Sequence, residues 1–316
     1  MNQSKRTIKD YAVITLKGMA MGAADVVPGV SGGTIAFITG IYDEFLGALK
    51  NCTPAALLIW KQKGFTVFWQ HINGSFLVAL FTGILLSIKT FAAIIEHALR
   101  AHPIWVWAFF FGLIIASIVL LARHMTQRWR VRDIAALLLG AALVAGISLA
   151  APTQLPGHWW VMFLGGFIAI CAMILPGISG SFLLLLMGLY PVFLGAVNHL
   201  EWDLLISFGA GAVCGLMVFS RALSWLLNHY HQVTVATLTG FLVGSLNVTW
   251  PWKEPVVTML NRHGEEVVVQ SSNVLPAQFA TVTGQSPDTL LAITFAIAGV
   301  MLVLIAEFFA SKFGKS

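Results

Sequence analysis

The sequence predicts an all-α integral membrane protein with an inverted-topology repeat, each half having one re-entrant helical hairpin and three transmembrane helices. Hydrophobic residues make up 58% of the 316 residues and charged residues only 10%, which excludes an ordinary soluble domain. Several apolar runs reach the roughly 20 residues that a helix needs to cross a bilayer. Two further apolar regions, one in each half of the chain, are interrupted by the same Pro-Gly-x-Ser-Gly motif.

The two halves have the same predicted order of elements. The first half, residues 1–151, has a broken apolar region at 7–49 and spans at 74–97, 103–123 and 132–151. The second half, residues 152–316, has a broken region at 159–197 and spans at 203–228, 233–250 and 289–311. Proline lacks an N–H and glycine tolerates positive φ, so each broken region is expected to form two short helices joined by a tight turn.

The sequences around the two breaks are related. Residues 28–49 and 176–197 share Pro, Gly, Ser and Gly of the motif, and the identity continues through Gly40/Gly188 and Tyr42/Tyr190. Two related Gly/Pro interruptions in corresponding positions are typical of a transporter whose binding site lies between two halves. A purely structural membrane protein would explain the spans but not the duplicated breaks.

The placement of Lys and Arg favours hairpins that re-enter the membrane without crossing it. With a cytoplasmic N-terminus, this topology places most basic residues on the inside. The basic residues on the outside are then Arg100, Lys253 and Arg262. Three crossings per half invert the second half and return the C-terminus to the cytoplasm. The polar loop 252–288 then lies outside, with a short hairpin around 261–264, and acts either as a cover over one entrance or as a plain connection.

Each break is followed by small and hydroxylated residues, which we predict to bind an anion. The first N–H groups of a helix are unpaired and lie at the positive end of its dipole, so they attract phosphate or carboxylate. The candidate residues are Ser31, Gly32, Gly33 and Thr34 in the first copy and Ser179, Gly180 and Ser181 in the second. The alternative is that the serines merely cap helices while the glycines allow close packing.

Charged residues within the apolar regions are the other candidates for function, because burying a charge in a membrane is costly. Lys89 and Arg221 each place one cation in a predicted span, where they would bind a phosphate or extend to the lipid headgroups. Asp25, near the first break, is a candidate for binding a proton or sodium ion. It would equally accept hydrogen bonds from the N–H groups of its own turn.

The remaining motifs point away from cofactor chemistry. The sequence has no nucleotide-binding P-loop and no zinc-protease motif. The histidines lie at presumed helix ends and the three cysteines have no paired spacing, so we expect no metal site and no cofactor. The net charge of +5 reflects basic loops rather than a nucleic-acid partner.

The two motifs resemble those of the bacterial polyprenyl-phosphate transporter family (PopT), formerly a membrane family of unknown function. The resemblance rests on DVVPGVSGGT at 25–34, GIYD at 40–43, LPGISGS at 175–181 and GLY at 188–190, and extends from about residue 17 to the last span. It implies a flippase, not an enzyme, that returns undecaprenyl phosphate from the outer to the inner leaflet of the bacterial cytoplasmic membrane. The loop 252–288 is not part of the resemblance.

Two other functions remain compatible with the sequence. A membrane polyprenyl-diphosphate phosphatase would also use serine- and glycine-rich re-entrant loops, but it would need a base or nucleophile arrangement beside the phosphate. Ser31 and Ser179 have only Asp25 nearby in the sequence. A transporter or channel for a soluble anion would need an enclosed pore instead of a groove open to lipid. The oligomeric state, the energy source and the prenyl chain length do not follow from the sequence.

Overall fold

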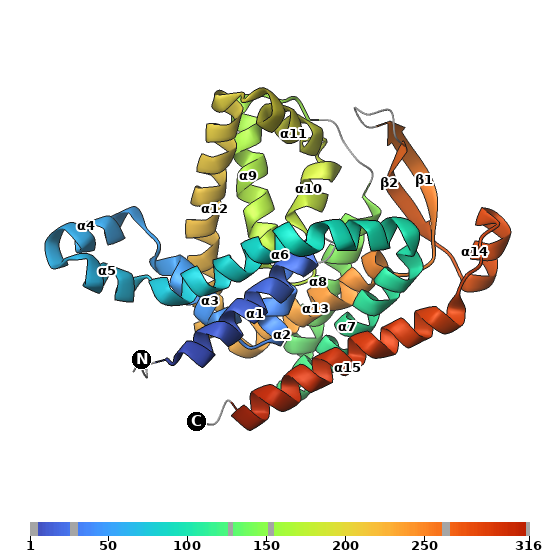
Figure 1. The fold of residues 1–316 in the computed structure, drawn as a ribbon, viewed down its shortest axis with the longest axis horizontal. Helices are drawn as coiled ribbons and strands as arrows, with labels where there is room; N and C mark the ends of the chain where they lie inside the picture. The colour runs from blue at the N-terminus through green and yellow to red at the C-terminus, as the bar shows by residue number, and fades with distance from the viewer. Residues whose placement is uncertain (1–5, 26–30, 126–128, 151–154, 261–265, 314–316) are drawn as a thin grey trace.

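The computed structural model of the protein describes residues 6–25, 31–125, 129–150, 155–260 and 266–313 (Figure 1). Its regular structure is helical apart from one two-stranded sheet, in agreement with the predicted all-α class. The first half forms α1 (Ile8–Asp25), α2 (Gly32–Ile38), α3 (Tyr42–Asn51), α4 (Pro54–Lys63), α5 (Phe65–His71), α6 (Gly74–Ala101), α7 (Pro103–His124) and α8 (Val131–Leu149). The second half forms α9 (Trp159–Ile174), α10 (Gly180–Leu186), α11 (Tyr190–His199), α12 (Trp202–His229), α13 (His231–Thr249), β1 (Lys253–Leu260), β2 (Glu266–Asn273), α14 (Pro276–Thr283) and α15 (Thr289–Phe313).

The six predicted spans all fall on helices, and some of these helices are long and apolar enough to cross a membrane within the described residues. By length and composition, α7, α8 and α12 can cross a membrane. Two bent pairs, α5 with α6 at 64° and α10 with α11 at 107°, bring the number within the described residues to at most five. The predicted span 233–250 does form a helix, α13, but its Thr, Gln and Asn side chains make it less apolar than its neighbours. The predicted span 289–311 lies within α15, whose fully described apolar stretch is Thr289–Ile305.

The broken regions contain three helices each, so the prediction of two helices and one turn was incomplete. The break at the motif separates α1 from α2 and α9 from α10, although residues 26–30 of the first break lie outside the described residues. A second break follows at Gly40 and at Gly188, both with φ of +70°. In each copy the N–H of the residue after the glycine donates to a carbonyl five residues earlier, the pattern of a Schellman helix end.

Four pairs of long helices pack closely through glycines. The pairs are α1 with α6, α9 with α12, α7 with α15 and α8 with α13, and α9 and α12 stand side by side in Figure 1. In every pair one glycine from each helix faces the backbone of its partner, leaving no room for a Cβ atom. These glycines are Gly18 with Gly83, Gly166 with Gly211, Gly112 with Gly299, and Gly140 with Gly240.

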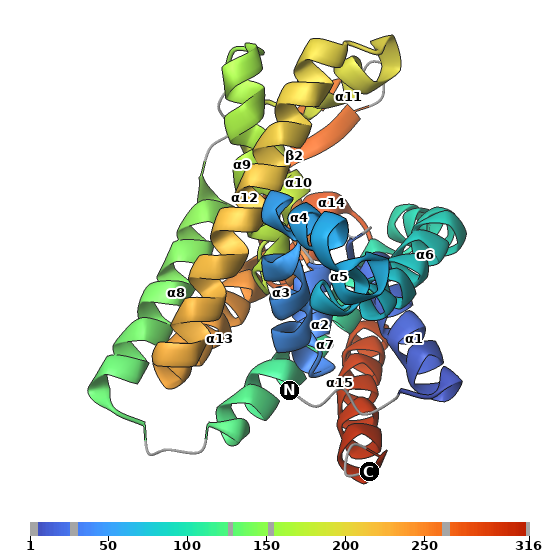
Figure 2. The same cartoon turned by 90° about the vertical axis from the view of Figure 1, so that its left-hand side faces the viewer.

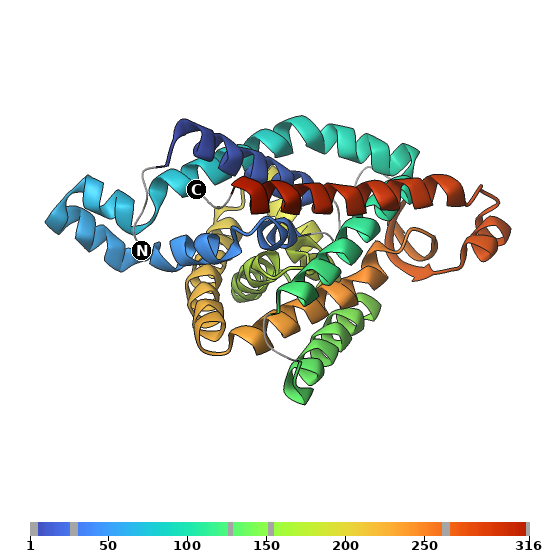
Figure 3. The ribbon, with the colours of Figure 1, turned by 90° about the horizontal axis from the view of Figure 1, so that it is seen from below.

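Two segments interrupt this common order of elements. The helices α4 and α5 follow α3 in the first half and project beyond the other helices (Figures 1 and 3). The antiparallel strands β1 and β2, with α14, lie between α13 and α15. The sequence predicted the hairpin but not α14, and the turn residues 261–265 lie outside the described residues.

The largest apolar core surrounds the two breaks. Ile35 and Tyr42 of the first copy are buried together with Ile174 and Ile178 of the second, and Leu242 of α13 closes the cluster. The start of α1 and the end of α15 lie on the same side of the molecule in two perpendicular views (Figures 1 and 2). Described residues on both sides of the sequence motif thus belong to one buried core.

Candidate functional site

The two breaks, far apart in sequence, contact each other directly. The N–H of Gly177 donates a hydrogen bond of 2.9 Å to Oγ1 of Thr34, 143 residues earlier in the chain. Thr34 is almost completely buried, with 1% of its surface exposed. Gly177 has φ of +85°, and a Cβ atom there would approach the carbonyl oxygen of Phe241 to 2.8 Å. The described residues of the two breaks are therefore in direct contact, which the sequence alone did not establish.

The end of α9 relies on hydroxyl groups from the first half. The last carbonyls of a helix have no partner within it, and they are costly to bury unpaired. Ser31 Oγ donates to the carbonyl of Met173 at 3.0 Å, and the Tyr42 hydroxyl donates to the carbonyl of Ile174 at 2.9 Å. Irregular backbone at membrane depth is stable only where such protein partners or water satisfy it. The first break thus stabilises the second.

The N–H groups at the start of α2 already have acceptors. Gly32 donates to Asp25 Oδ1 at 2.6 Å, and Gly33 donates to Ser31 Oγ at 3.1 Å. The N–H of Thr34 donates to the carbonyl oxygen of Ser31 at 2.9 Å. The carboxylate of Asp25 therefore occupies the position predicted for an external anion. Of the two alternatives for Asp25, its bond to the amide of its own turn is present in this conformation.

The short helix α2 is held at both ends by charged residues of α1. Asp25 accepts at its N-terminal end, while Lys17 Nζ donates to the carbonyl of Thr39 at its C-terminal end, at 2.8 Å. This arrangement matches the sign of the helix dipole at each end. Sequence analysis did not identify Lys17, although its spacing of two helical turns from Asp25 places both residues on one face of α1.

The start of α10 differs because Met173 stands where the first copy has Asp25. Ser179 Oγ accepts from the N–H of Phe182 at 3.4 Å and lies 3.0 Å from Ser181 Oγ. Ser179 and Gly180 are buried, and Ser181 is exposed. This helix start presents two adjacent hydroxyls without a neighbouring carboxylate, so it remains the better anion-binding candidate of the two.

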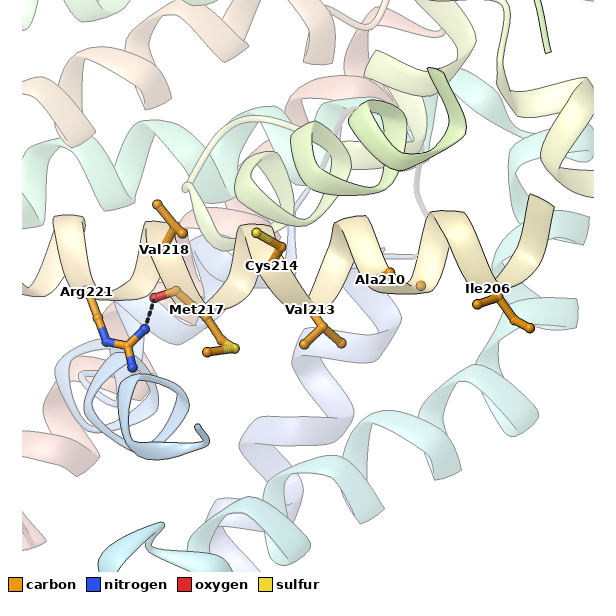
Figure 4. Close-up of a pocket in the computed structure, with 8 residues that line it drawn as sticks. Ile206, Ala210, Val213, Cys214, Met217, Val218 and Arg221 are labelled. Carbon is orange, nitrogen blue, oxygen red and sulfur yellow. Dashed lines mark hydrogen bonds between the residues drawn. The ribbon is translucent and has the colours of Figure 1, made fainter. Parts of the chain in front are cut away.

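Arg221 lies at one end of a shallow, open groove along α12, and every residue that lines it belongs to this one helix (Figure 4). The groove has a volume of about 500 Å³, and its other lining residues are apolar or small. Arg221 is exposed, and its Nη1 donates to the carbonyl of Met217 at 3.2 Å. The groove is lined by Ile206, Gly209, Ala210, Val213, Cys214, Met217, Val218 and Arg221. An apolar surface ending at a cation is suited to a molecule with an apolar tail and an anionic head.

The predicted cations and hydroxyls are not all brought together. Among the described residues, no hydrogen bond or ion pair joins Arg221 to Ser179 or Ser181. Lys89 lies in α6, but its side chain is outside the described residues. Tyr42, which the sequence marked only as identical with Tyr190, turns out to contact the second break. The structure therefore contains two separate features, a centre where the breaks interlock and a groove on α12.

Comparison with known proteins places these features in a family. Residues 21–267 match the family described as VCA0040-like, undecaprenyl phosphate translocase-like. A Vibrio cholerae protein named polyprenyl-phosphate transporter is 47% identical over 303 residues, which cover 96% of this chain and 98% of that protein. A Staphylococcus aureus protein of the same name is 32% identical over 256 residues, covering 75% of this chain and 85% of that protein. No solved structure matches the chain significantly.

Proposed function

Because the chain belongs to the undecaprenyl phosphate translocase-like family, we propose that it moves a polyprenyl phosphate across the bacterial cytoplasmic membrane. The relatives named polyprenyl-phosphate transporter support this class of substrate. The observation that carries the proposal is the apolar groove on α12 that ends at the guanidinium of Arg221. We further propose transport from the outer to the inner leaflet, which returns the carrier lipid to the cytoplasmic side.

The groove would reduce the main energetic cost of such transport, which is the removal of water from the charged phosphate head. A phosphate monoester carries a charge of about −1.5 to −2 at neutral pH, and moving it through hydrocarbon without partners is prohibitively costly. A guanidinium binds phosphate oxygens in a fixed two-pronged geometry, so Arg221 would replace part of the water around the head. Ile206, Val213 and Met217 lie on one face of α12, and this face is about 22 Å long from residue 206 to residue 221. The prenyl tail would lie along it.

Two inverted repeats, 1–151 and 152–316, provide the proposed route for alternating access. The matching glycine contacts and the equal φ at Gly40 and Gly188 support a common architecture for the two halves. The bend of 107° between α10 and α11 fits a re-entrant hairpin. With both termini cytoplasmic, the second hairpin would enter from the outside.

Asp25 is the residue that we propose for coupling to a proton or a sodium ion. Its carboxylate accepts from the N–H of Gly32 at the centre of the protein. Binding a cation would weaken this bond and release the start of α2 to interact with the phosphate head. Ser31, Gly32, Gly33 and Thr34 would then contribute to the site together with Ser179, Gly180 and Ser181, while Lys89 and Arg221 supply positive charge.

An exchange assay in liposomes tests this function. The purified protein is reconstituted with polyprenyl phosphate in both leaflets, and a soluble phosphatase is added to the exterior. We expect the protein to make nearly all of the lipid phosphate accessible, whereas protein-free liposomes release only the exterior half. Release of phosphate by the protein without added phosphatase would instead indicate an enzyme. Passage of soluble anions into the liposomes without lipid exchange would indicate a transporter of soluble anions.

A further inference from the structure

A second cavity lies at the end of α13, away from the interlocked breaks and the groove. It has a volume of about 500 Å³, within the range of small-molecule sites. The start of α7 provides Trp107, α14 provides Phe279 and Thr283, and β1 provides Lys253. Apolar walls with a few polar groups are typical of a site that binds an amphipathic molecule.

Lys253 provides a positive charge at this cavity. Its Nζ lies 3.6 Å from the centre of the Trp107 ring and donates to the carbonyl of Val248 in the last turn of α13. Burial lowers the pKa of the Lys253 ammonium to about 7, because removal from water disfavours the charged form. Glu254 also lines the cavity, but within the described residues no ion pair joins it to Lys253. An incoming anion would restore the charged form of the lysine.

The cavity is built largely by the segment that has no counterpart in the first half. There, only residues 125–130 connect α7 to α8, whereas β1, β2 and α14 are inserted between α13 and α15. Two indoles hold the segment in place: Trp250 Nε1 donates to the carbonyl of Val274 at 2.9 Å, and the buried Trp252 donates through Nε1 to the carbonyl of Pro287 at 2.7 Å. Helix packing alone does not explain why this inserted segment covers the end of α13.

The cavity and the groove lie at opposite ends of α13. Arg221 precedes the end of α12, where α13 begins, and Lys253 follows the end of α13. The 19 residues of α13 separate its two ends by about 28 Å, close to the thickness of a bilayer core. The chain therefore carries Lys253 just beyond one end of α13, and Arg221 on α12 about two helical turns before the turn that leads into the other end.

We propose that the Lys253 cavity is a docking site for a phosphate monoester head at the outer end of the protein. Lys253 binds the phosphate, Thr283 lies within reach of its oxygens, and Trp107 and Phe279 contact the first isoprene unit. This inference rests on the proposed function for its role as the entry site for substrate. The same chemistry would also bind free inorganic phosphate, so the test must separate the two sources.

Calorimetry with farnesyl phosphate tests the site in the full-length protein. The Arg221→Ala protein serves as the background, which removes the groove as a competing site. We expect Lys253→Met to weaken farnesyl phosphate binding by about tenfold or more, and Lys253→Arg to retain most of it. Lys61→Met, which removes an exposed lysine of α4, should leave binding unchanged. Equal affinity for farnesyl phosphate in the Lys253→Met and background proteins would overturn the proposal.

Two further arms identify the ligand and separate this inference from the proposed function. Farnesol should bind at least about tenfold more weakly than farnesyl phosphate, because it lacks the charged group. Inorganic phosphate binding as tightly as farnesyl phosphate would overturn the assignment to a lipid head. If the wild-type protein exchanges lipid but Lys253→Met binds farnesyl phosphate as tightly as the background protein, only the docking site is refuted. If farnesyl phosphate binding depends on Lys253 but the wild-type protein exchanges no lipid, only the transport function is refuted.

Discussion

Replacing Gly33 with alanine should destabilise the protein because it separates the two breaks. A Cβ atom on Gly33 would lie 2.6 Å from the carbonyl oxygen of Ile174 and 2.9 Å from that of Met173. The first distance is about 0.8 Å short of ordinary van der Waals contact. Both neighbours are backbone atoms at the end of a buried helix, so no flexible side chain can move aside. The helix α2 must therefore move away from α9.

The cost has two components. Overpacking a buried contact costs roughly 1–3 kcal/mol, and each weakened hydrogen bond from Ser31 and Tyr42 adds about 1 kcal/mol. We expect Gly33→Ala to lower the free energy of unfolding by about 3–5 kcal/mol, measured by denaturant titration in detergent. Gly47→Ala is the matched control, because no heavy atom lies within 4 Å of its added Cβ and alanine favours its helix by roughly 0.5–1 kcal/mol. Equal stability of the two variants would refute the close contact of the breaks.

Two further substitutions test the hydrogen bonds at this centre. Thr34→Val keeps the shape of the side chain but leaves the buried N–H of Gly177 without its acceptor. We expect the free energy of unfolding to fall by about 1–3 kcal/mol in the same titration. A fall no larger than that of Thr294→Val, on the exposed face of α15, would contradict this. Asp25→Asn should keep the fold, since its amide oxygen can still accept from Gly32, while Asp25→Ala should cost about 1–2 kcal/mol. In liposomes, lipid exchange by Asp25→Asn should no longer respond to a proton or sodium gradient; a wild-type response would rule out coupling through Asp25.

Local motifs predicted the parts of the fold that depend on neighbouring residues. The Pro-Gly motif located the main breaks, and the two runs 256–260 and 266–270 on either side of a turn sequence located the β-hairpin. The second break was also visible in principle, because Gly40 and Gly188 each follow an apolar helix, where glycine commonly ends it. The six predicted spans relied on apolar length, and each lies on a helix. The helix α13 is the least apolar of them, and its threonines bond to its own helical carbonyls.

The partners across the two halves could not be predicted from the sequence. Ser31 bonds to a carbonyl 142 residues away, and this contact depends on how α2 packs against α9. The same pattern of small residues predicted an anion site, but the carboxylate of Asp25 accepts at the start of α2 in this conformation. Arg221 was identified from the cost of a charge in an apolar helix, yet its distance from the breaks follows from packing. Lys253 was identified only as an exterior loop residue, because its enclosure arises from α7 and α14.

The initial rate of polyprenyl phosphate exchange by Arg221→Ala in liposomes tests the account most directly. Arg123→Ala is the matched control, because Arg123 is also an exposed arginine near a helix end but lies outside the groove. Removing the guanidinium should slow exchange by about tenfold or more, since charge-assisted hydrogen bonds to phosphate contribute roughly 1.5–3 kcal/mol, while the control keeps the wild-type rate. Wild-type exchange by a folded Arg221→Ala protein would contradict transport along the α12 groove.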